Sequence, residues 1–397
     1  MKIGILTFHR PSNFGANLQA YSSVCYFKSL GHDVKVIDYI RPSDIGYKDS
    51  VDAKQFEAHK HFVESRLPMT VQVMDEDGLT QVVADEKFDV ILIGADAVWR
   101  SPKDNNIFFA EWLFKDDRIR DIAVCSISAA HMGIGFTDQR AEGIKSIHDC
   151  LTKFKYITVR DSWTRDVLNR DIFGGENFVK VVNPDPVTML SLYTDSEAWI
   201  SHGQEAKKYY LLSLPKNWAK EGKTVINRRK WFNAFKKCVN ETGYKLIEFP
   251  IPEGKSGFEF DGCVEYPIDP IQWFLWIKNA KAFCGLRFHA IVSSISNGTP
   301  FYSIDSYGNR DKYNVILDMI GLHTIARSRD QKSKIRNLLK DTSFESHRTG
   351  AYIEFEDPKK VFKKLEYCMI ADVIKVRDNY RKIFTTNMSE LFKLIEK

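Results

Sequence analysis

The stretch AKAFCGLRFHAIVSSISNGTPFYSID, from Ala280 to Asp305, decides the fold of this chain. Its apolar run Ala282-Phe283-Cys284 predicts a short buried strand that ends at Gly285. Apolar residues then recur at helical spacing over 290–296, and Asn297-Gly298 predicts the end of that helix. A second apolar run closes the stretch. The pattern therefore predicts a strand, a sharp turn, a helix and another strand.

Arg287 and His289 lie at the turn between the first predicted strand and the helix. In an open α/β sheet, this end of a strand borders the ligand crevice. A guanidinium, a helix N-terminus and an imidazole at one place would suit a phosphate or a carboxylate. The alternative is that His289 caps the helix while Arg287 pairs with a surface carboxylate. These residues alone leave both interpretations open.

The start of the chain repeats the same kind of unit. Residues 2–8 predict an apolar strand, and 9–15 form a loop rich in breaker residues. A helix is expected from about Ala16 to Gly31, followed by a strand over 34–39. This βαβ order predicts a parallel, doubly wound sheet.

The first loop is similar in kind to a phosphate-binding loop, but it is not GxGxxG and it lacks a Walker lysine. Asn13, Asn17 and Gln19 could hydrogen-bond a polyhydroxylated ligand. The alternative is that Asn13 only supports the turn.

Two further strand ends carry polar residues. The apolar run 88–93 predicts a buried parallel strand, and Asp96 and Trp99 follow it as a candidate sugar-facing pair. Asp96 is equally suited to cap a helix. The strand predicted over 122–130 ends at His131, and Arg160 directly follows a further strand predicted over 156–159.

We predict two Rossmann-like α/β domains facing a cleft. The N-terminal domain is expected over 1–195 and the C-terminal domain over 209–345, joined by a polar linker at 194–208. A helix is expected at 311–320, and a helical tail over 355–397 is expected to cross back to the first domain.

Composition bounds the function. The 397 residues include 57 basic and 52 acidic side chains, a net charge of +5 that does not indicate nucleic-acid binding. The seven cysteines contain no CxxC pair, as expected of reduced cytoplasmic thiols. We find neither a signal peptide nor an apolar run that could span a bilayer, so we expect a cytoplasmic protein.

Six blocks in order resemble the polysaccharide pyruvyl transferase family across about the first 305 residues. They are the opening KIGILTFHRPSNFGANLQAYSSVCYFKSLGHDVKVIDY and then ILIGADAVW, SISAAHMG, ITVRD, NPDPVTML and GLRFHA. The resemblance implies a fold similar to the two-domain GT-B glycosyltransferases. It also implies transfer of the carbon skeleton of phosphoenolpyruvate to a sugar as a ketal. Ala97 replaces the usual Gln and His131-Met132 replaces a Ser-Phe pair, which puts the acceptor specificity in doubt.

The implied chemistry assigns roles to residues. Phosphoenolpyruvate has two anionic groups, which favour arginine forks over lysine. The expected donor-binding residues are Arg160, Arg287 and Phe288, with both arginines facing one crevice, and His289 is expected to transfer protons. The expected acceptor-binding residues are Asn13, Gly15, Asn17, Asp96, Trp99 and His131. Phosphoenolpyruvate is the co-substrate, and neither a metal nor another cofactor is expected.

The same fold is compatible with two other functions. A nucleotide-sugar glycosyltransferase of the same fold would commonly bind ribose with a carboxylate in the second domain, and none lies between Asp269 and Asp305. A non-catalytic carbohydrate-binding relative is the third, because a fold does not guarantee activity. The acceptor (lipid-linked, nucleotide-linked or polymeric), a peripheral membrane association and the oligomeric state are left open.

Overall fold

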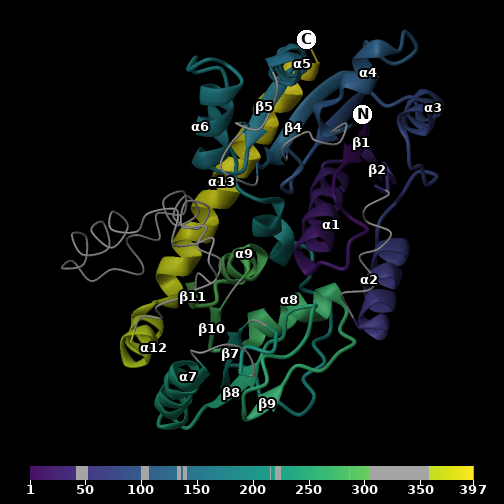
Figure 1. Cartoon of the computed structure of the whole chain (residues 1–397). Coiled ribbons are helices and arrows are strands. Elements are labelled where there is room, and N and C mark those ends of the chain that lie inside the picture. The colour runs from purple at the N-terminus through teal and green to yellow at the C-terminus, as the bar shows by residue number, and fades with distance from the viewer. Residues whose placement is uncertain are drawn as a thin grey trace. The chain divides into compact units, whose positions relative to one another are not determined.

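The computed structural model describes residues 1–41, 52–99, 107–131, 136, 141–214, 216–219, 225–285, 287–303 and 357–396. The chain divides into two compact units (Figure 1). Unit 1 comprises Met1–Asp49, Phe56–Tyr193 and Tyr380–Lys397, and unit 2 comprises Ser50–Gln55 and Thr194–Asn379. Each unit contains its own parallel sheet, which confirms the predicted α/β class. The predicted helix at 311–320 lies outside the described residues, and the cleft stays a prediction.

Unit 1 is built on a six-stranded sheet in the order β2-β1-β3-β4-β5-β6, with every neighbouring pair parallel. The strands are β1 Lys2–Leu6, β2 Asp33–Val36, β3 Val90–Ile93, β4 Ala123–Ala129, β5 Tyr156–Val159 and β6 Val181–Val182. All of β3 is buried, as its unbroken apolar run predicts. The strand order reverses direction at β1, so a switch point lies between β1 and β3.

The helices of unit 1 follow local sequence signals. They are α1 Phe14–Ser29, most of α2 Ala53–Arg66, α3 Glu76–Glu86, η2 Ile107–Phe109, α4 Glu111–Lys115, α5 Ala141–Leu151, α6 Ser162–Asp171 and η3 Pro186–Leu192. Asn13 caps α1, Asp75 caps α3 and Asp161 caps α6, in each case by accepting backbone N–H groups.

Unit 2 is built on a five-stranded sheet in the order β11-β10-β7-β8-β9, again parallel throughout. Its strands are β7 Tyr209–Ser213, β8 Lys245–Glu248, β9 Gly262–Cys263, β10 Ala282–Gly285 and β11 Phe301–Ser303. Its helices are α7 Val225–Asn240, α8 Pro270–Asn279, α9 Phe288–Asn297 and α12 Pro358–Tyr367. The strand, helix and strand predicted from Ala282 onward are β10, α9 and β11.

The C-terminal region is helical, as predicted. The 26-residue α13 spans Ile370–Ile395 and is the long yellow helix of Figure 1. Its residues from Tyr380 onward belong to unit 1, where the rings of Phe384 and Tyr26 are in edge contact at 4.9 Å. None of the described helices combines the length and apolarity that crossing a membrane requires.

The helix α2 is rich in charged residues, yet one of its faces is buried. Phe62 and Val63 of α2 are fully buried, and His59 is 1% exposed. These residues fall at i, i+3 and i+4 on one face of α2, so that face packs into unit 1. The many charged residues of the helix hid this narrow stripe from the sequence pattern.

Candidate active site

The turn between β10 and α9 depends on Gly285. Its φ is +152°, and a Cβ at this position would lie 2.6 Å from the backbone oxygen of Ser213 on β7. Any other residue would push the two strands apart at their carboxyl ends. Glycine therefore allows the sharp turn that brings Arg287 to the start of α9.

Arg287 occupies the N-cap position of α9 with φ +83° and ψ 124°, and its side chain does not cap the helix. A positive φ is uncommon for a non-glycine residue, and such strain is concentrated at functional sites. The guanidinium Nη2 donates to both carboxylate oxygens of Glu253, at 2.6 and 2.7 Å. Both side chains are about 30% exposed, so an anionic ligand in solvent could reach this pair.

Glu253 and Tyr266 were not found from the sequence. Both lie in irregular segments without a motif, and only the folded chain brings them to Arg287. The Tyr266 hydroxyl donates to the carbonyl of Pro250 at 2.8 Å. Burial, with a further contribution from the Glu253 charge, raises the pKa of Tyr266 well above its usual value. Tyr266 therefore stays protonated beside the ion pair.

Phe288 and His289 form the first turn of α9. Their rings are in edge contact, with centroids 4.8 Å apart. His289 is partly buried and lies inside the helix, so it does not hold the N-cap position. The positive end of the α9 dipole, the Arg287 guanidinium and the His289 imidazole are thus contributed by three consecutive residues.

In unit 1, Arg160 follows β5 and is only 3% exposed. Its Nη1 lies 3.4 Å from Asp185 Oδ2, 3.7 Å from Asp96 Oδ1 and 3.4 Å from the Ala95 carbonyl. The sequence predicted the cation and Asp96, but not that Asp185 and Asp96 would both approach it. Arg160 lies in unit 1 and Arg287 in unit 2, so their joint binding of one donor stays a prediction.

The two members of the predicted sugar-facing pair lie in different environments. Asp96 is half-buried, and its carboxylate accepts a hydrogen bond from the Ala97 N–H at 2.6 Å. The Trp99 side chain is fully buried, donates through Nε1 to the Phe108 carbonyl at 2.9 Å and stacks on Phe109. We therefore treat Trp99 as a core residue, because its indole offers no exposed face for a sugar ring.

His131 follows β4 and is 2% exposed. Its Nδ1 lies 2.7 Å from the Trp99 carbonyl, which can only accept, so Nδ1 carries a proton. Burial lowers the pKa of His131, and the ring is therefore neutral near pH 7. Its Nε2 has no hydrogen-bond partner within the part of the chain that the structure describes.

The predicted acceptor residues at the loop before α1 and in its first turn already form hydrogen bonds within the protein. Asn13 accepts from the Gly15 N–H at 2.9 Å, which is the turn-supporting alternative stated above. Asn17 is fully buried and donates to the His9 carbonyl at 2.7 Å. Its Oδ1 is therefore the atom that faces His59 Nδ1, at 2.5 Å. Their assignment to the acceptor site stays a prediction, and their observed contacts shape the loop.

A buried ionic group at the end of β1 was missed by the sequence analysis. Asp38 accepts from Arg10 Nε at 2.9 Å and lies 2.9 Å from His9 Nε2. Burial alone would raise the pKa of Asp38, but the hydrogen bonds from Arg10 and His9 outweigh it and lower the pKa to about 2. The long sequence separation of these residues explains why no spacing rule found them.

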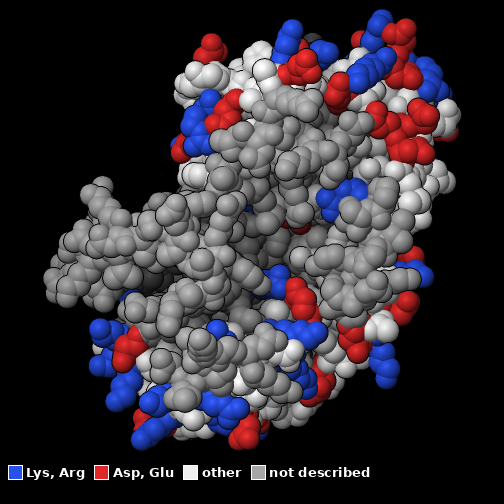
Figure 2. Space-filling view, in the orientation of Figure 1, with Lys and Arg blue, Asp and Glu red and all other residues white. Residues whose placement is uncertain are grey.

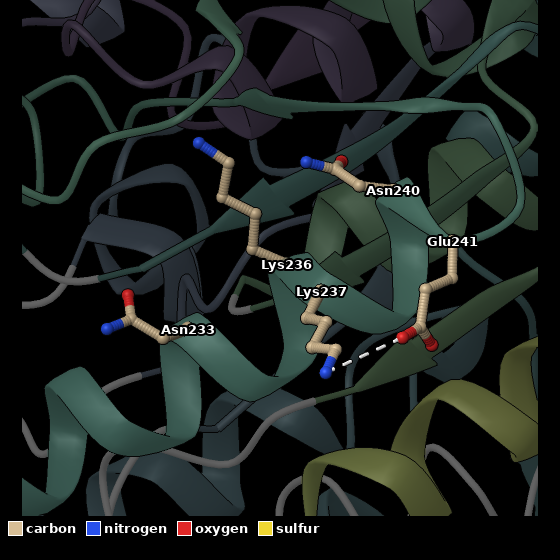
Figure 3. A pocket seen from close by; sticks show the side chains of 5 residues that line it. All are labelled: Asn233, Lys236, Lys237, Asn240 and Glu241. Atoms are coloured by element: carbon tan, nitrogen blue, oxygen red, sulfur yellow. Dashed lines mark ion pairs between the residues drawn. The ribbon is translucent and has the colours of Figure 1, made fainter.

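A hollow on α7 lies apart from these residues (Figure 3). Asn233, Lys236, Lys237, Asn240 and Glu241 line it, and all five are on or just beyond the same helix. None of the candidate residues contributes to it. Lys236 is paired with Asp261 and Lys237 with Glu241, at 2.9 and 3.8 Å. We do not assign the active site to this hollow.

Comparison with solved structures supports the fold. An alpha-glucosyltransferase in complex with UDP-glucose and abasic DNA matches with a TM-score of 0.50 at 12% identity, covering 100% of each chain. A UDP-GlcNAc 2-epimerase from Neisseria meningitidis matches at 0.48 and 11%, covering 94% of this chain and 100% of that one. A putative UDP-N-acetylglucosamine 2-epimerase from Listeria monocytogenes matches at 0.48 and 12%, covering 78% and 81%. The first of these shows that the two-unit α/β fold is of the GT-B glycosyltransferase kind.

Comparison with curated proteins finds no match. A family model does match, over residues 13–307, which is well over half of the chain. This range contains every candidate residue described above, from Asn13 to His289. The chain therefore belongs to the polysaccharide pyruvyl transferase family.

Proposed function

We propose that this protein transfers the pyruvyl group of phosphoenolpyruvate to two hydroxyls of a sugar, forming a ketal and releasing phosphate. The observation that carries the proposal is the first turn of α9, where Arg287, the helix N-terminus and His289 are adjacent. This arrangement provides a partly exposed cation for an anionic donor and an imidazole for proton transfer. Family membership supports the same reaction class.

Donor binding is assigned first. Arg287 binds one anionic group of phosphoenolpyruvate, and Glu253, its partner at 2.6 Å, holds the guanidinium in place before the donor arrives. The α9 N–H groups add partial positive charge on the same side. Arg160 is assigned to the second anionic group, although its contacts with Asp185 and Asp96 already neutralise much of its charge.

The chemical steps require proton transfer at two points. Protonation of C3 turns the methylene into a methyl group and leaves an oxocarbenium-like centre at C2, which a sugar hydroxyl attacks. The C2–O bond to phosphate then breaks, and a second hydroxyl of the same sugar closes the ketal. The diol loses two protons, of which one balances the proton gained by C3 and one leaves with phosphate. His289 is assigned to deliver and accept these protons.

The acceptor side is assigned to unit 1. Asp96 is half-buried at the carboxyl end of β3, where its carboxylate can accept hydrogen bonds from sugar hydroxyls. His131 is assigned to the same side; its Nε2 is buried and has no partner among the described residues. Asn13, Gly15 and Asn17 are assigned to shape the neighbouring loop through the contacts described above. Trp99 supports His131 through its backbone carbonyl.

A donor-binding experiment tests the proposal without knowledge of the acceptor. We expect titration calorimetry to show binding of phosphoenolpyruvate, with affinity reduced at least tenfold in Arg287→Ala because a charged hydrogen bond contributes about 1.5–3 kcal/mol. Arg229→Ala is the matched control, since Arg229 is an exposed arginine on α7 of the same unit. Adding simple methyl glycosides should then release phosphate. Binding of UDP-glucose with no binding of phosphoenolpyruvate would overturn the proposal.

A further inference from the structure

The outward face of α12 is strongly basic. Lys359, Lys360 and Lys363 are exposed, and none of them forms an ion pair within the described part of the chain. Lys359 and Lys363 are one helical turn apart, and Lys360 lies beside them. Figure 2 shows Lys and Arg side chains gathered at the lower left, where Figure 1 places α12 and α7.

The nearby carboxylates are committed to other contacts. Asp357 caps α12 by accepting from the backbone N–H groups of Lys359 and Lys360, at 3.0 and 3.1 Å. Glu366 accepts from the Tyr210 hydroxyl of β7. Neither carboxylate forms an ion pair with Lys359, Lys360 or Lys363, and the lysines of α12 outnumber its carboxylates.

Apolar side chains continue the same surface. Tyr367, one turn beyond Lys363, is 76% exposed, and Met369 and Ile370 at the start of α13 are 60% and 48% exposed. The opposite face of α12 packs into unit 2 through Val361 and Leu365, which are 1% and 2% exposed. Burial of that face fixes the orientation of the helix, so the exposed apolar residues are not a consequence of a loose end.

We propose that this α12 patch, comprising Lys359, Lys360, Lys363, Tyr367, Met369 and Ile370, docks the protein on an anionic lipid bilayer. The lysines match the negative surface of such a bilayer. Tyrosine is favoured at the interface of a membrane, and the two aliphatic side chains can enter the acyl boundary. A soluble polyanion would pair with the lysines but would leave the three apolar side chains in water. An anionic bilayer offers negative charge to the lysines and an apolar environment to the three apolar side chains.

Vesicle flotation of the full chain tests the proposal. We expect binding to vesicles rich in phosphatidylglycerol and much weaker binding to phosphatidylcholine alone. The triple variant Lys359→Gln, Lys360→Gln, Lys363→Gln should weaken binding on the order of a hundredfold, because each lysine near a charged membrane contributes about a fivefold factor. A matched triple variant, Lys54→Gln, Lys60→Gln and Lys145→Gln, removes exposed lysines elsewhere and should bind like the wild type.

A second variant separates the bilayer from a soluble polyanion. Tyr367→Ser with Met369→Ser and Ile370→Ser should abolish the binding that survives added salt, while binding to heparin stays unchanged. Equal flotation of this variant and the wild type would overturn the proposal in favour of a polyanion surface. Absence of wild-type flotation would also overturn it. Unchanged thermal melting of each variant shows that the loss is not due to unfolding, and none of these outcomes depends on the proposed transfer reaction.

Discussion

At the first turn of α9, three consecutive residues have different surroundings, and these define different roles. Arg287 is held by Glu253, Phe288 contacts the ring of His289, and His289 lies within the helix. A residue that binds the donor changes its affinity, whereas a residue that moves protons changes the rate. Kinetics can therefore separate Arg287 from His289.

We predict that His289→Gln lowers kcat by about 100-fold or more while the affinity for phosphoenolpyruvate stays within a few-fold. Glutamine preserves the approximate volume and some hydrogen bonding but cannot titrate. Normal turnover at saturating donor would remove His289 from the mechanism.

A second prediction at this scale concerns His59, which contacts Asn17 in the first turn of α1. Burial lowers the pKa of His59 from 6.5 to about 3. Below about pH 6.5, His59 therefore binds a proton in the unfolded chain but stays neutral in the folded chain. The contribution of neutral His59 to the free energy of unfolding is therefore fully present above that pH. It is lost as the pH falls toward 3, by up to about 1.4 kcal/mol per pH unit.

The His59→Gln variant should show this directly. Its free energy of unfolding, measured by urea titration, should fall less steeply than that of the wild type between pH 6.5 and 4. His61→Gln, on the exposed side of the same helix, is the control and should keep the wild-type slope. Equal slopes for His59→Gln and wild type would contradict the assigned burial effect.

Among the elements, those defined by local signals were predicted most closely. β5 has its predicted bounds, and β10 differs from its own by one residue, because Gly285 marks its end. α3 and β9 were not predicted as separate elements. β9 has only two residues and exists through its pairing with β8, which no periodicity can reveal.

The helix α13 gives the prediction at the scale of elements. Phe384, Met388 and Leu391 are fully buried and belong to unit 1. Phe384→Ala should lower the free energy of unfolding by about 3–5 kcal/mol, since it leaves a cavity against Tyr26. Differential scanning calorimetry of both variants checks this. Thr386→Ala, on the exposed side of α13, should have little effect on the melting temperature. An unchanged melting temperature for Phe384→Ala would contradict the packing of α13 on unit 1.

In the whole molecule, the α/β class, the two parallel sheets and the helical C-terminal region could be predicted from the sequence. The site could be predicted only in part. Arg160, Arg287 and His289 are at strand or helix ends that local sequence marks. Their partners Glu253 and Asp185 reach them only through the tertiary fold, from 34 and 25 residues away in the sequence. Trp99 was predicted as a sugar-facing residue but is fully buried, because a position after a strand does not reveal whether a side chain points into the core.

The central claim is that C3 of phosphoenolpyruvate is protonated from solvent while its carbon skeleton moves to a sugar. Mass spectrometry of the reaction with a methyl glycoside in deuterated water tests this most directly. We expect a pyruvate ketal whose methyl group carries a single solvent deuterium, formed in step with phosphate and formed at least about 100-fold more slowly by His289→Gln. Glycoside recovered without a ketal, or a glycoside elongated from UDP-glucose under the same conditions, would contradict pyruvyl transfer.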